Sequence, residues 1–193
     1  TSVISDADVT TNIGHADREV RKRVLAYHYD ERLEGNINST NKEFKAKHKP
    51  IADGDMDQDV DSSDVTGHTI DTDATTGFRE TSSAAVTSVN ARDGIVTLTT
   101  APASDGTVEE VTLDYYSVNP RTDMNDVYRC SSILAAVFGL MQLSGGSAGF
   151  SYTAGRFSVT KGQNNQYSEL ISKLIHQYEA LISTLITEIS LVE

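Results

Sequence analysis

The hydrophobic positions near the N-terminus recur at helical spacing. Ser5 or Asp6 can cap a short helix that Gly14 ends, and a second helix is expected from about Ala16 to Glu34, stopped by Gly35. The apolar residues of this second helix recur at steps of three and four: Val20, Val24 and Tyr27, and beside them Leu25, Tyr29 and Leu33.

A dense positive patch lies on this predicted helix, at Arg18, Arg21, Lys22 and Arg23. Two interpretations fit it. The cluster is a solvated helix face that pairs with Glu19, Asp30 and Glu31, or Arg18, Arg21 and Arg23 form a docking site for an acidic partner.

From Asn38 to Pro120 the apolar period changes to two, which predicts strands. In residues 108–118, Val111, Leu113 and Tyr115 point to one face and Thr112, Asp114 and Tyr116 to the other. Residues 84–90 and 94–102 flank the turn sequence ARDG and form a hairpin. With further strands over 41–51 and 64–71, the segment is a small antiparallel barrel or sandwich of four or five strands.

Helix returns after Thr122. Asp123 caps a helix over 124–144 that Gly145 and Gly146 end, and 150–160 is a short strand or an extended loop. A last helix is expected from near Asn164 to Glu193, with an apolar stripe that needs a partner. We expect the following part of that stripe to meet another chain: Leu181, Ile182, Leu185, Ile186 and Ile189.

The order helix, sheet, helix predicts an α+β fold. Residues 1–37 and 121–193 form one helical bundle, and residues 38–120 are a β domain inserted into it. Such insertions are tolerated where the two ends of the insert lie close together.

The net charge of the chain argues against one class of function and favours one kind of source. Lys and Arg number 16 against 28 Asp and Glu, a net charge of −12. Sequence-independent binding to a phosphate backbone needs clustered positive charge, so the composition argues against it. An acidic surface is typical of proteins kept soluble in concentrated salt, which favours a halophilic source.

Neither a disulfide framework nor a membrane span is predicted. Cys130 is the only cysteine, and it lies in an apolar helical stretch typical of a core position. The longest apolar run, Ile133 to Met141, is far short of the roughly 20 residues that cross a bilayer. The acidic N-terminus is not typical of a signal peptide, and we expect a soluble protein.

The stretch IADGDMDQDVDSSDV concentrates aspartates at the spacing of a calcium loop. Counting from Asp53, the positions that supply ligands in a 12-residue EF-hand-type loop hold Asp53, Asp55, Asp57, Asp59 through its carbonyl, and Asp64. Val60 stands at the inward apolar position, but Gln58 replaces the glycine usual at position 6. The loop is either a structural Ca²⁺ site, with Mg²⁺ a weaker candidate, or a hydrated acidic turn.

Catalysis is not expected. The histidines at 15, 28, 48, 68 and 176 are scattered, without H-x-H or H-E-x-x-H spacing, and no nucleophile stands beside a base. The glycine-rich segment 144–149 follows a helix instead of opening one, which is typical of a connector.

The C-terminal half resembles a known family. The helix YRCSSILAAVFGLMQLS, then FSYTAGRFSVTKG and YSELISKLIHQYEALI, is similar to the head–tail adaptor (connector) proteins of tailed viruses. The opening SDADVTTNIG and DREVRKRVLAY are similar to their first helices. The inserted β domain with its acidic loop resembles the version carried by viruses of salt-loving archaea.

This resemblance implies a structural protein of the virion neck, between head and tail, assembled in the host cytoplasm. It implies a self-assembled ring, usually of twelve copies, below the portal protein, with a further neck or tail-completion protein docked on it. DNA would pass the channel only as cargo, and the C-terminal helix would engage the portal. The alternative is a calcium-stabilised recognition or decoration module that binds through the β domain.

Overall fold

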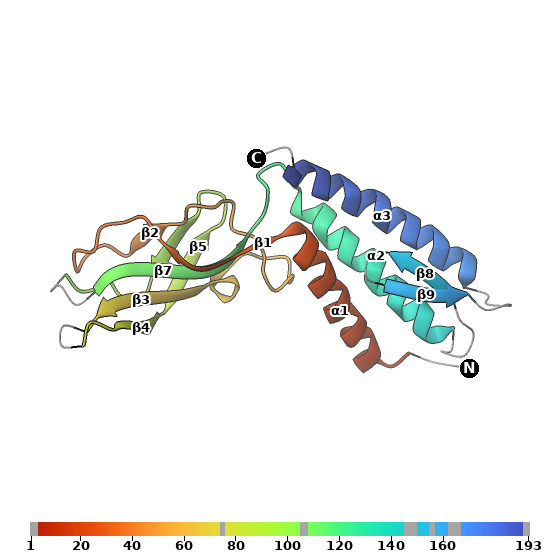
Figure 1. The fold of residues 1–193 in the computed structure, drawn as a ribbon, viewed down its shortest axis with the longest axis horizontal. Helices are drawn as coiled ribbons and strands as arrows, with labels where there is room; N and C mark the ends of the chain where they lie inside the picture. Colours follow the sequence, from red (N-terminus) through yellow and green to blue (C-terminus); the bar gives the residue numbers. More distant parts are fainter. Residues whose placement is uncertain are drawn as a thin grey trace. The chain divides into compact units, whose positions relative to one another are not determined.

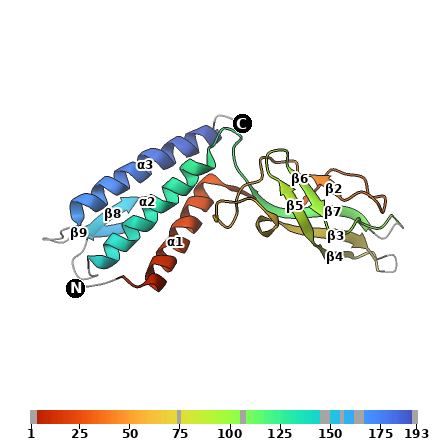
Figure 2. The same ribbon diagram turned by 180° about the vertical axis from the view of Figure 1, so that it is seen from behind.

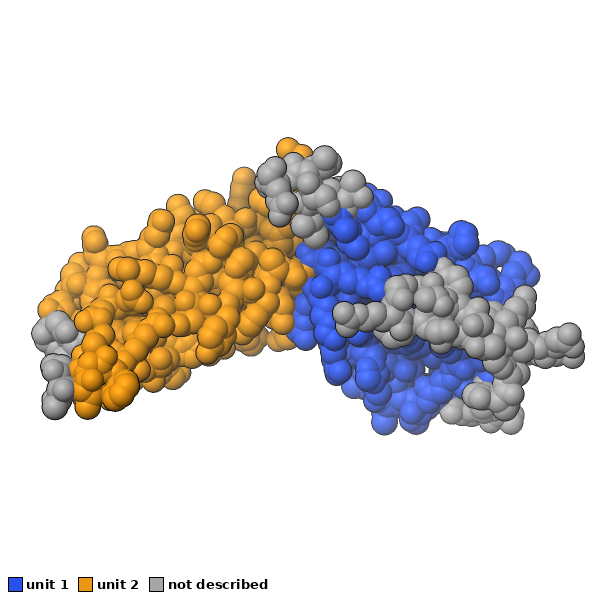
Figure 3. Space-filling model, in the orientation of Figure 1, with its two compact units in different colours: residues 1–24, 122–193 blue, residues 25–121 orange. Residues whose placement is uncertain are grey.

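A computed structural model describes residues 4–73, 76–104, 108–144, 150–154, 157–161 and 167–190 of the chain, with side chains except in 150–161 and 187–190. The fold is α+β, and the chain divides into two compact units (Figures 1 and 3). The helical unit comprises residues 1–24 and 122–193, and the β unit comprises residues 25–121.

The described part of the helical unit contains three helices: α1 (Asp6–Val24), α2 (Met124–Leu143) and α3 (Ser168–Ser190). Helix α2 lies between the other two (Figures 1 and 2). Asp123 caps α2 as predicted, because its side chain accepts a hydrogen bond of 2.9 Å from the Asn125 amide. The short segment after α2 is a hairpin of β8 (Phe150–Ala154) and β9 (Phe157–Lys161).

The core of the helical unit contains one apolar face from each helix. The buried set includes Ala16, Val20, Val24, Val127, Cys130, Leu134, Val137, Ile171, Ile175, Tyr178, Ile182 and Leu185. In addition, the hydroxyl of Ser131 donates a hydrogen bond to the Asp17 carboxylate between α2 and α1. Among the described helices, none combines the length and the apolar character that a bilayer crossing needs.

The predicted helix ends in the N-terminal segment are wrong. Helix α1 runs through Gly14 without a break and ends at Val24, not at Glu34. One exposed glycine costs a helix only about 1 kcal/mol, which the burial of Ala16 and Val20 offsets. Residues 26–32 form strand β1, so the helical unit gives way to the β unit at 24/25 instead of 37/38.

The β unit contains a four-stranded sheet in the order β1-β7-β3-β4. Its strands are β1 (Ala26–Arg32), β7 (Val108–Ser117), β3 (Thr66–Thr72) and β4 (Arg79–Ala84), and every pairing is antiparallel. A three-stranded antiparallel sheet has the order β2-β6-β5, from β2 (Glu43–Lys45), β6 (Ile95–Leu98) and β5 (Val86–Asn90).

The two sheets join at both edges into a small barrel. On one side, β4 continues into β5 across Ala85. On the other, Glu34, two residues beyond β1, exchanges two backbone hydrogen bonds of 2.8 Å with Lys45 at the end of β2. Both sheets bury residues in one core, among them Phe44, Val96, Leu98, Val111, Leu113 and Tyr115.

The strand predictions were better where apolar residues alternate. Strands β3, β5, β6 and β7 lie in the predicted segments, and Val111, Leu113 and Tyr115 face the core together as expected. Only 43–45 of the predicted strand 41–51 is extended and paired as a strand. Strands β1 and β4 were missed, because β4 is polar and largely exposed and β1 carries the helical-looking pattern described above.

Candidate metal sites and docking surfaces

The Asp-rich loop of the β unit folds around two buried carboxylates. Asp53 is fully buried, and its carboxylate accepts hydrogen bonds from the backbone amides of Met56 (2.5 Å), Gln58 (2.7 Å) and Asp57 (3.3 Å). Asp64 is also buried and accepts from the amides of Gly54 (2.5 Å), Asp61 (2.9 Å) and Asp55 (3.2 Å). The side chains therefore fix the loop backbone, as in Asx-turns.

Three of the predicted metal ligands come together. Asp53, Asp55 and Asp57 each offer one carboxylate oxygen, and these oxygens lie within 4.8 Å of one another, so the cluster could hold a metal ion. Asp59 and Asp64 contribute no side-chain oxygen to this group, and both oxygens of Asp64, like those of Asp53, accept from backbone amides. Gln58 has a φ of 79°, the left-handed conformation that favours glycine at this loop position.

Burial and neighbouring like charges both act on the carboxylates of the loop. Burial raises the pKa of Asp64, and the nearby charge of Asp53 raises it further against three backbone hydrogen bonds. Burial likewise raises the pKa of Asp55, and the negative charge of Asp57 raises it further. Burial and like charge both disfavour the ionised carboxylate, and a bound cation would favour it.

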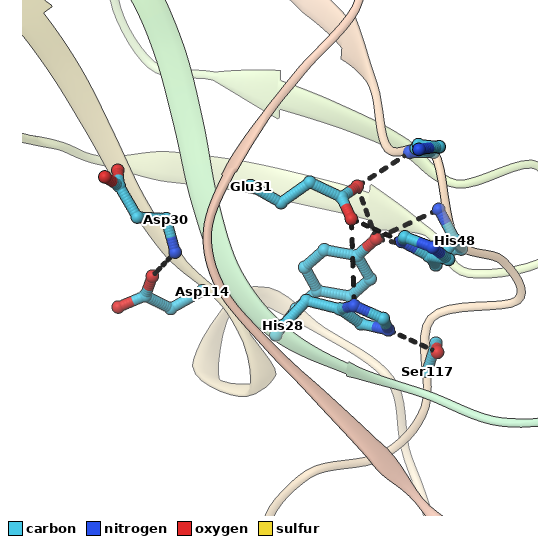
Figure 4. Close-up of polar contacts among 8 residues, drawn as sticks. His28, Asp30, Glu31, His48, Asp114 and Ser117 are labelled. Carbon is cyan, nitrogen blue, oxygen red and sulfur yellow. Dashed lines mark hydrogen bonds and ion pairs between the residues drawn. The ribbon is translucent and has the colours of Figure 1, made fainter.

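A second group of metal-binding side chains lies at the junction of the two sheets (Figure 4). His28 and Glu31 come from β1, and His48 comes from the segment after β2. One ligand atom from each residue lies within 4.8 Å of the others. The His28 Nδ1 is 3.7 Å from the Glu31 Oε2, and the His48 Nδ1 contacts the same oxygen. The imidazole rings stack with centroids 4.1 Å apart and planes 6° from parallel.

Strand β7 and the segment after β2 form hydrogen bonds with the outer atoms of this group. The Tyr115 hydroxyl donates to the Glu31 Oε1 over 2.7 Å and accepts from the His48 amide over 3.1 Å. The Lys47 amide also donates to the Glu31 Oε1, over 2.8 Å, and the Ser117 hydroxyl lies 2.7 Å from the His28 Nε2. The carboxylate and the imidazole of β1 are therefore fixed on the side away from their shared centre.

A β-bulge places His28 and Glu31 on one face. His28 pairs with Tyr115 and Glu31 with Leu113, so two residues of β1 stand opposite one residue of β7. Asp30, within the bulge, has a φ of 52°, and its amide donates to the Asp114 Oδ1 over 2.6 Å (Figure 4). Without the extra residue, side chains three apart on a strand would point to opposite faces.

The electrostatics of the group follow from partial burial. Burial lowers the pKa of His28, and the neighbouring His48 lowers it further against the opposing effect of Glu31. Burial alone would raise the pKa of Glu31, but hydrogen bonds from Tyr115, His48 and the Lys47 amide outweigh it and hold the carboxyl ionised. Burial and the Glu31 carboxylate raise the pKa of Tyr115 well above its usual range.

This group was not predicted from the sequence, because the histidines are scattered along the chain and residues 26–32 follow a helical pattern. The local signal is H-x-x-E in β1, but its meaning depends on the bulge, and His48 joins only through the barrel closure.

The predicted partner-binding residues of α3 divide into two sets. Ile182 and Leu185 are buried in the core of their own helical unit, so they are not exposed to a partner. Leu181 is half-buried and Ile186 is 38% exposed. The side chain of Ile189 lies outside the part of the chain that the structure describes.

The basic cluster of α1 also divides. Arg18 is exposed, whereas Arg21 and Arg23 are half-buried. Arg23 lies close enough to Tyr178 and Cys130 for its charge to oppose the rise in their pKa caused by burial. Lys22 pairs with Glu19 over 3.6 Å, as expected for a solvated face, but Asp30 and Glu31 belong to the β unit.

Two of the grooves that border α2 differ in their lining. The first, about 350 Å³, lies against α1 and is lined by Val9, Asn12, Ile13, Ser132, Ala135, Ala136 and Gly139. Val9 and Ile13 are 44% and 46% exposed there. The second, also about 350 Å³, lies against α3 and is lined by Arg129, Ile133, Gln177, Ala180, Leu181 and Thr184.

Sequence comparison adds no relative to this picture. The chain matches no protein-family model, and it matches no curated protein.

Proposed function

We propose that this chain is a structural subunit of a tailed virus, a head–tail adaptor that assembles into a ring through its helical unit. The resemblance of its helical segments to that family motivates the proposal. The observation that carries it is that α2 borders two unlike grooves, an apolar one against α1 and one of mixed polar and apolar lining against α3. A closed ring needs a head-to-tail interface, in which one surface of each subunit binds a different surface of the next.

A second copy of this chain is the proposed occupant of the α1/α2 groove. Its α2 wall carries only small side chains, at Ser132, Ala135, Ala136 and Gly139, so a helix can approach closely. On α3, Leu170, Leu174 and Leu181 recur at steps of four and seven along one flank, and Leu170 is 47% exposed. This flank would insert into the groove of the neighbouring subunit.

The proposed ring suits the charge of the chain. The net charge of −12 would let DNA pass through a channel without adhering to its wall. The portal protein, and a neck or tail-completion protein, would then contact the ring from its two sides. The copy number implied by the family is twelve.

Charge substitutions in the two surfaces test the ring. Leu181→Asp and Ala136→Asp should block incorporation on portal-bearing heads and remove the ring from native mass spectra, with unchanged circular dichroism. Ser172→Asp, on the exposed opposite flank of α3, adds the same charge and should assemble normally. Assembly of Leu181→Asp and Ala136→Asp at the Ser172→Asp level would refute the proposed interface.

We also propose that the Asp-rich loop binds Ca²⁺ as a structural ion. Asp53, Asp55 and Asp57 would provide side-chain oxygens and Asp59 its carbonyl, because Ca²⁺ takes six to eight hard oxygen ligands. Mg²⁺ is a poorer fit, since it holds its own waters and needs a stricter octahedron. A bound cation would favour the ionised form of Asp55 and Asp64, against the burial and the neighbouring like charge that raise their pKa.

Calorimetric titration of the chain with Ca²⁺ tests this site. One saturable equivalent is expected, weakened at least tenfold by Asp55→Asn. Asp59→Asn removes the same charge from the same loop but keeps the carbonyl, and should bind as the wild type does. An equal loss of Ca²⁺ affinity in both variants, or no saturable heat of binding, would show that the loop is only an acidic surface turn. Calcium binding in a chain that remains monomeric beside portal-bearing heads would instead favour the recognition or decoration module.

A further inference from the structure

We propose that His28, Glu31 and His48 form a binding site for one divalent transition metal ion, with Zn²⁺ as the natural fit, and that the ion joins the two sheets of the β unit. The site is separate from the Asp-rich loop, and it does not depend on the proposed adaptor function. Its ligands would be the Nδ1 atoms of both histidines and the Oε2 of Glu31.

The donor atoms are close to the spacing of a metal site. Zinc bonds of about 2.0–2.1 Å in a tetrahedron place neighbouring donors roughly 3.3 Å apart. The His28 Nδ1 and the Glu31 Oε2 are 3.7 Å apart, near that spacing. The His48 Nδ1 lies closer to the same oxygen, and the His48 ring is stacked on the His28 ring, so His48 must turn out of the stack and move outward for both Nδ1 lone pairs to point at one ion. The His48 side chain is 47% exposed, so it can move without disturbing the core.

The outer atoms of the ligands are already oriented. The Ser117 hydroxyl holds the His28 Nε2, and the Tyr115 hydroxyl and the Lys47 amide hold the Glu31 Oε1. These contacts turn the His28 Nδ1 and the Glu31 Oε2 toward one shared centre (Figure 4). Metal-binding histidines and carboxylates are typically held by such outer hydrogen bonds, which fix the tautomer and the orientation of the ligand.

The donor set selects the class of ion. Two imidazole nitrogens and one carboxylate oxygen suit Zn²⁺, Co²⁺, Ni²⁺ and Cu²⁺, whereas Ca²⁺ prefers an all-oxygen shell. Three protein ligands leave one coordination position, which water fills on the exposed side of His48. The two candidate sites of the β unit therefore differ in the ions they select.

Such an ion would act as a cross-link. His28 and Glu31 belong to the four-stranded sheet, and His48 follows β2 of the three-stranded sheet by three residues. The backbone of this segment bridges to the four-stranded sheet at Glu34 with Lys45 and again at Ile51 with Ser117, on either side of His48. An ion that binds only the closed barrel stabilises it by mass action and raises its unfolding temperature.

Titration of the tag-free, metal-stripped chain with Co²⁺ and Zn²⁺ tests the site. We expect one equivalent of Co²⁺ with the strong visible absorption of low-coordinate cobalt, displaced by Zn²⁺ but not by excess Ca²⁺. His48→Ala should weaken binding about 100-fold, and Tyr115→Phe should weaken it about 10-fold through the orientation of Glu31. His68→Gln, another half-buried histidine of the same unit, should bind normally.

Two results would overturn the proposal. The first is the absence of a saturable Co²⁺ spectrum in the wild-type chain. The second is binding that survives His48→Ala unchanged but is lost in Asp55→Asn, which would place the ion in the Asp-rich loop. Because His48 is exposed, loss of folding does not obscure its variant, and circular dichroism verifies this directly.

Discussion

Removal of one hydroxyl group, by Tyr115→Phe, should selectively weaken the β unit. The Tyr115 side chain is 1% exposed, and its hydroxyl links β7 to Glu31 on β1 and to His48 beyond β2. Phenylalanine fills the same space, so the change leaves no cavity. It removes hydrogen bonds and nothing else.

The expected loss follows from the two partners left behind. A hydrogen bond to a charged group such as Glu31 contributes about 1.5–3 kcal/mol, and the amide of His48 loses its acceptor at a further cost of up to about 1 kcal/mol. Partial solvation of His48 reduces the second contribution. We therefore expect the free energy of opening of the β unit to fall by about 2–3 kcal/mol, which speeds opening-limited exchange by about 30- to 150-fold.

Amide hydrogen exchange in metal-free solution, followed residue by residue, separates the two units. Amides of β7 and β3 should exchange faster in Tyr115→Phe, while amides of α2 keep their protection. Tyr29→Phe, on the neighbouring strand β1, is the matched control, because Tyr29 is 77% exposed. An acceleration of less than about threefold in β7, or an equal acceleration in α2, would show that the hydroxyl does not secure the barrel.

Three further predictions each concern the substitution of one side chain. Tyr178 buries a hydroxyl with no hydrogen-bond partner among the described residues, so Tyr178→Phe should stabilise the helical unit by about 1 kcal/mol in urea unfolding; a loss would indicate a hidden partner. Gln58→Gly should raise the stability of the metal-free loop by about 1 kcal/mol, because it relieves a φ of 79°; faster exchange of the loop amides would contradict this. Burial raises the pKa of Cys130 to about 12, so the folded state retains a proton that the unfolded chain loses above about pH 9. Stability should therefore fall between pH 9 and 11, by up to about 1.4 kcal/mol per pH unit from this group, and the fall should be shallower in Cys130→Ala.

Local sequence patterns correctly predicted the helices and strands whose conformation follows from their own residues and does not depend on a distant partner strand. Helices α2 and α3 carry long apolar stripes, and β7 alternates strictly, so their type was evident from the residues alone. Strand β1 was predicted as a helix because its tyrosines and the leucines that flank it, Leu25 and Leu33, fall at helical steps. Pairing with β7, more than eighty residues away, determines its actual conformation.

The two candidate metal sites show the same contrast. The Asp-rich loop is local, so the spacing of its aspartates was enough to propose a ligand set before the fold was known. The second group needs β1 paired with β7, a bulge that brings His28 and Glu31 to one face, and the closure that brings His48 beside them. No spacing along the chain encodes that combination of events.

The pairing of β1 with β7 also bears on how such a chain can evolve. Ala26 stands opposite Ser117, so the strand that enters the β unit and the strand that leaves it are hydrogen-bonded neighbours at its root. Their Cα atoms are therefore only about 5 Å apart, a gap that a tight turn spans. Everything between them behaves as a cassette: a lineage can lose it, enlarge it or exchange it for another fold, and the helices before and after it need not change their register.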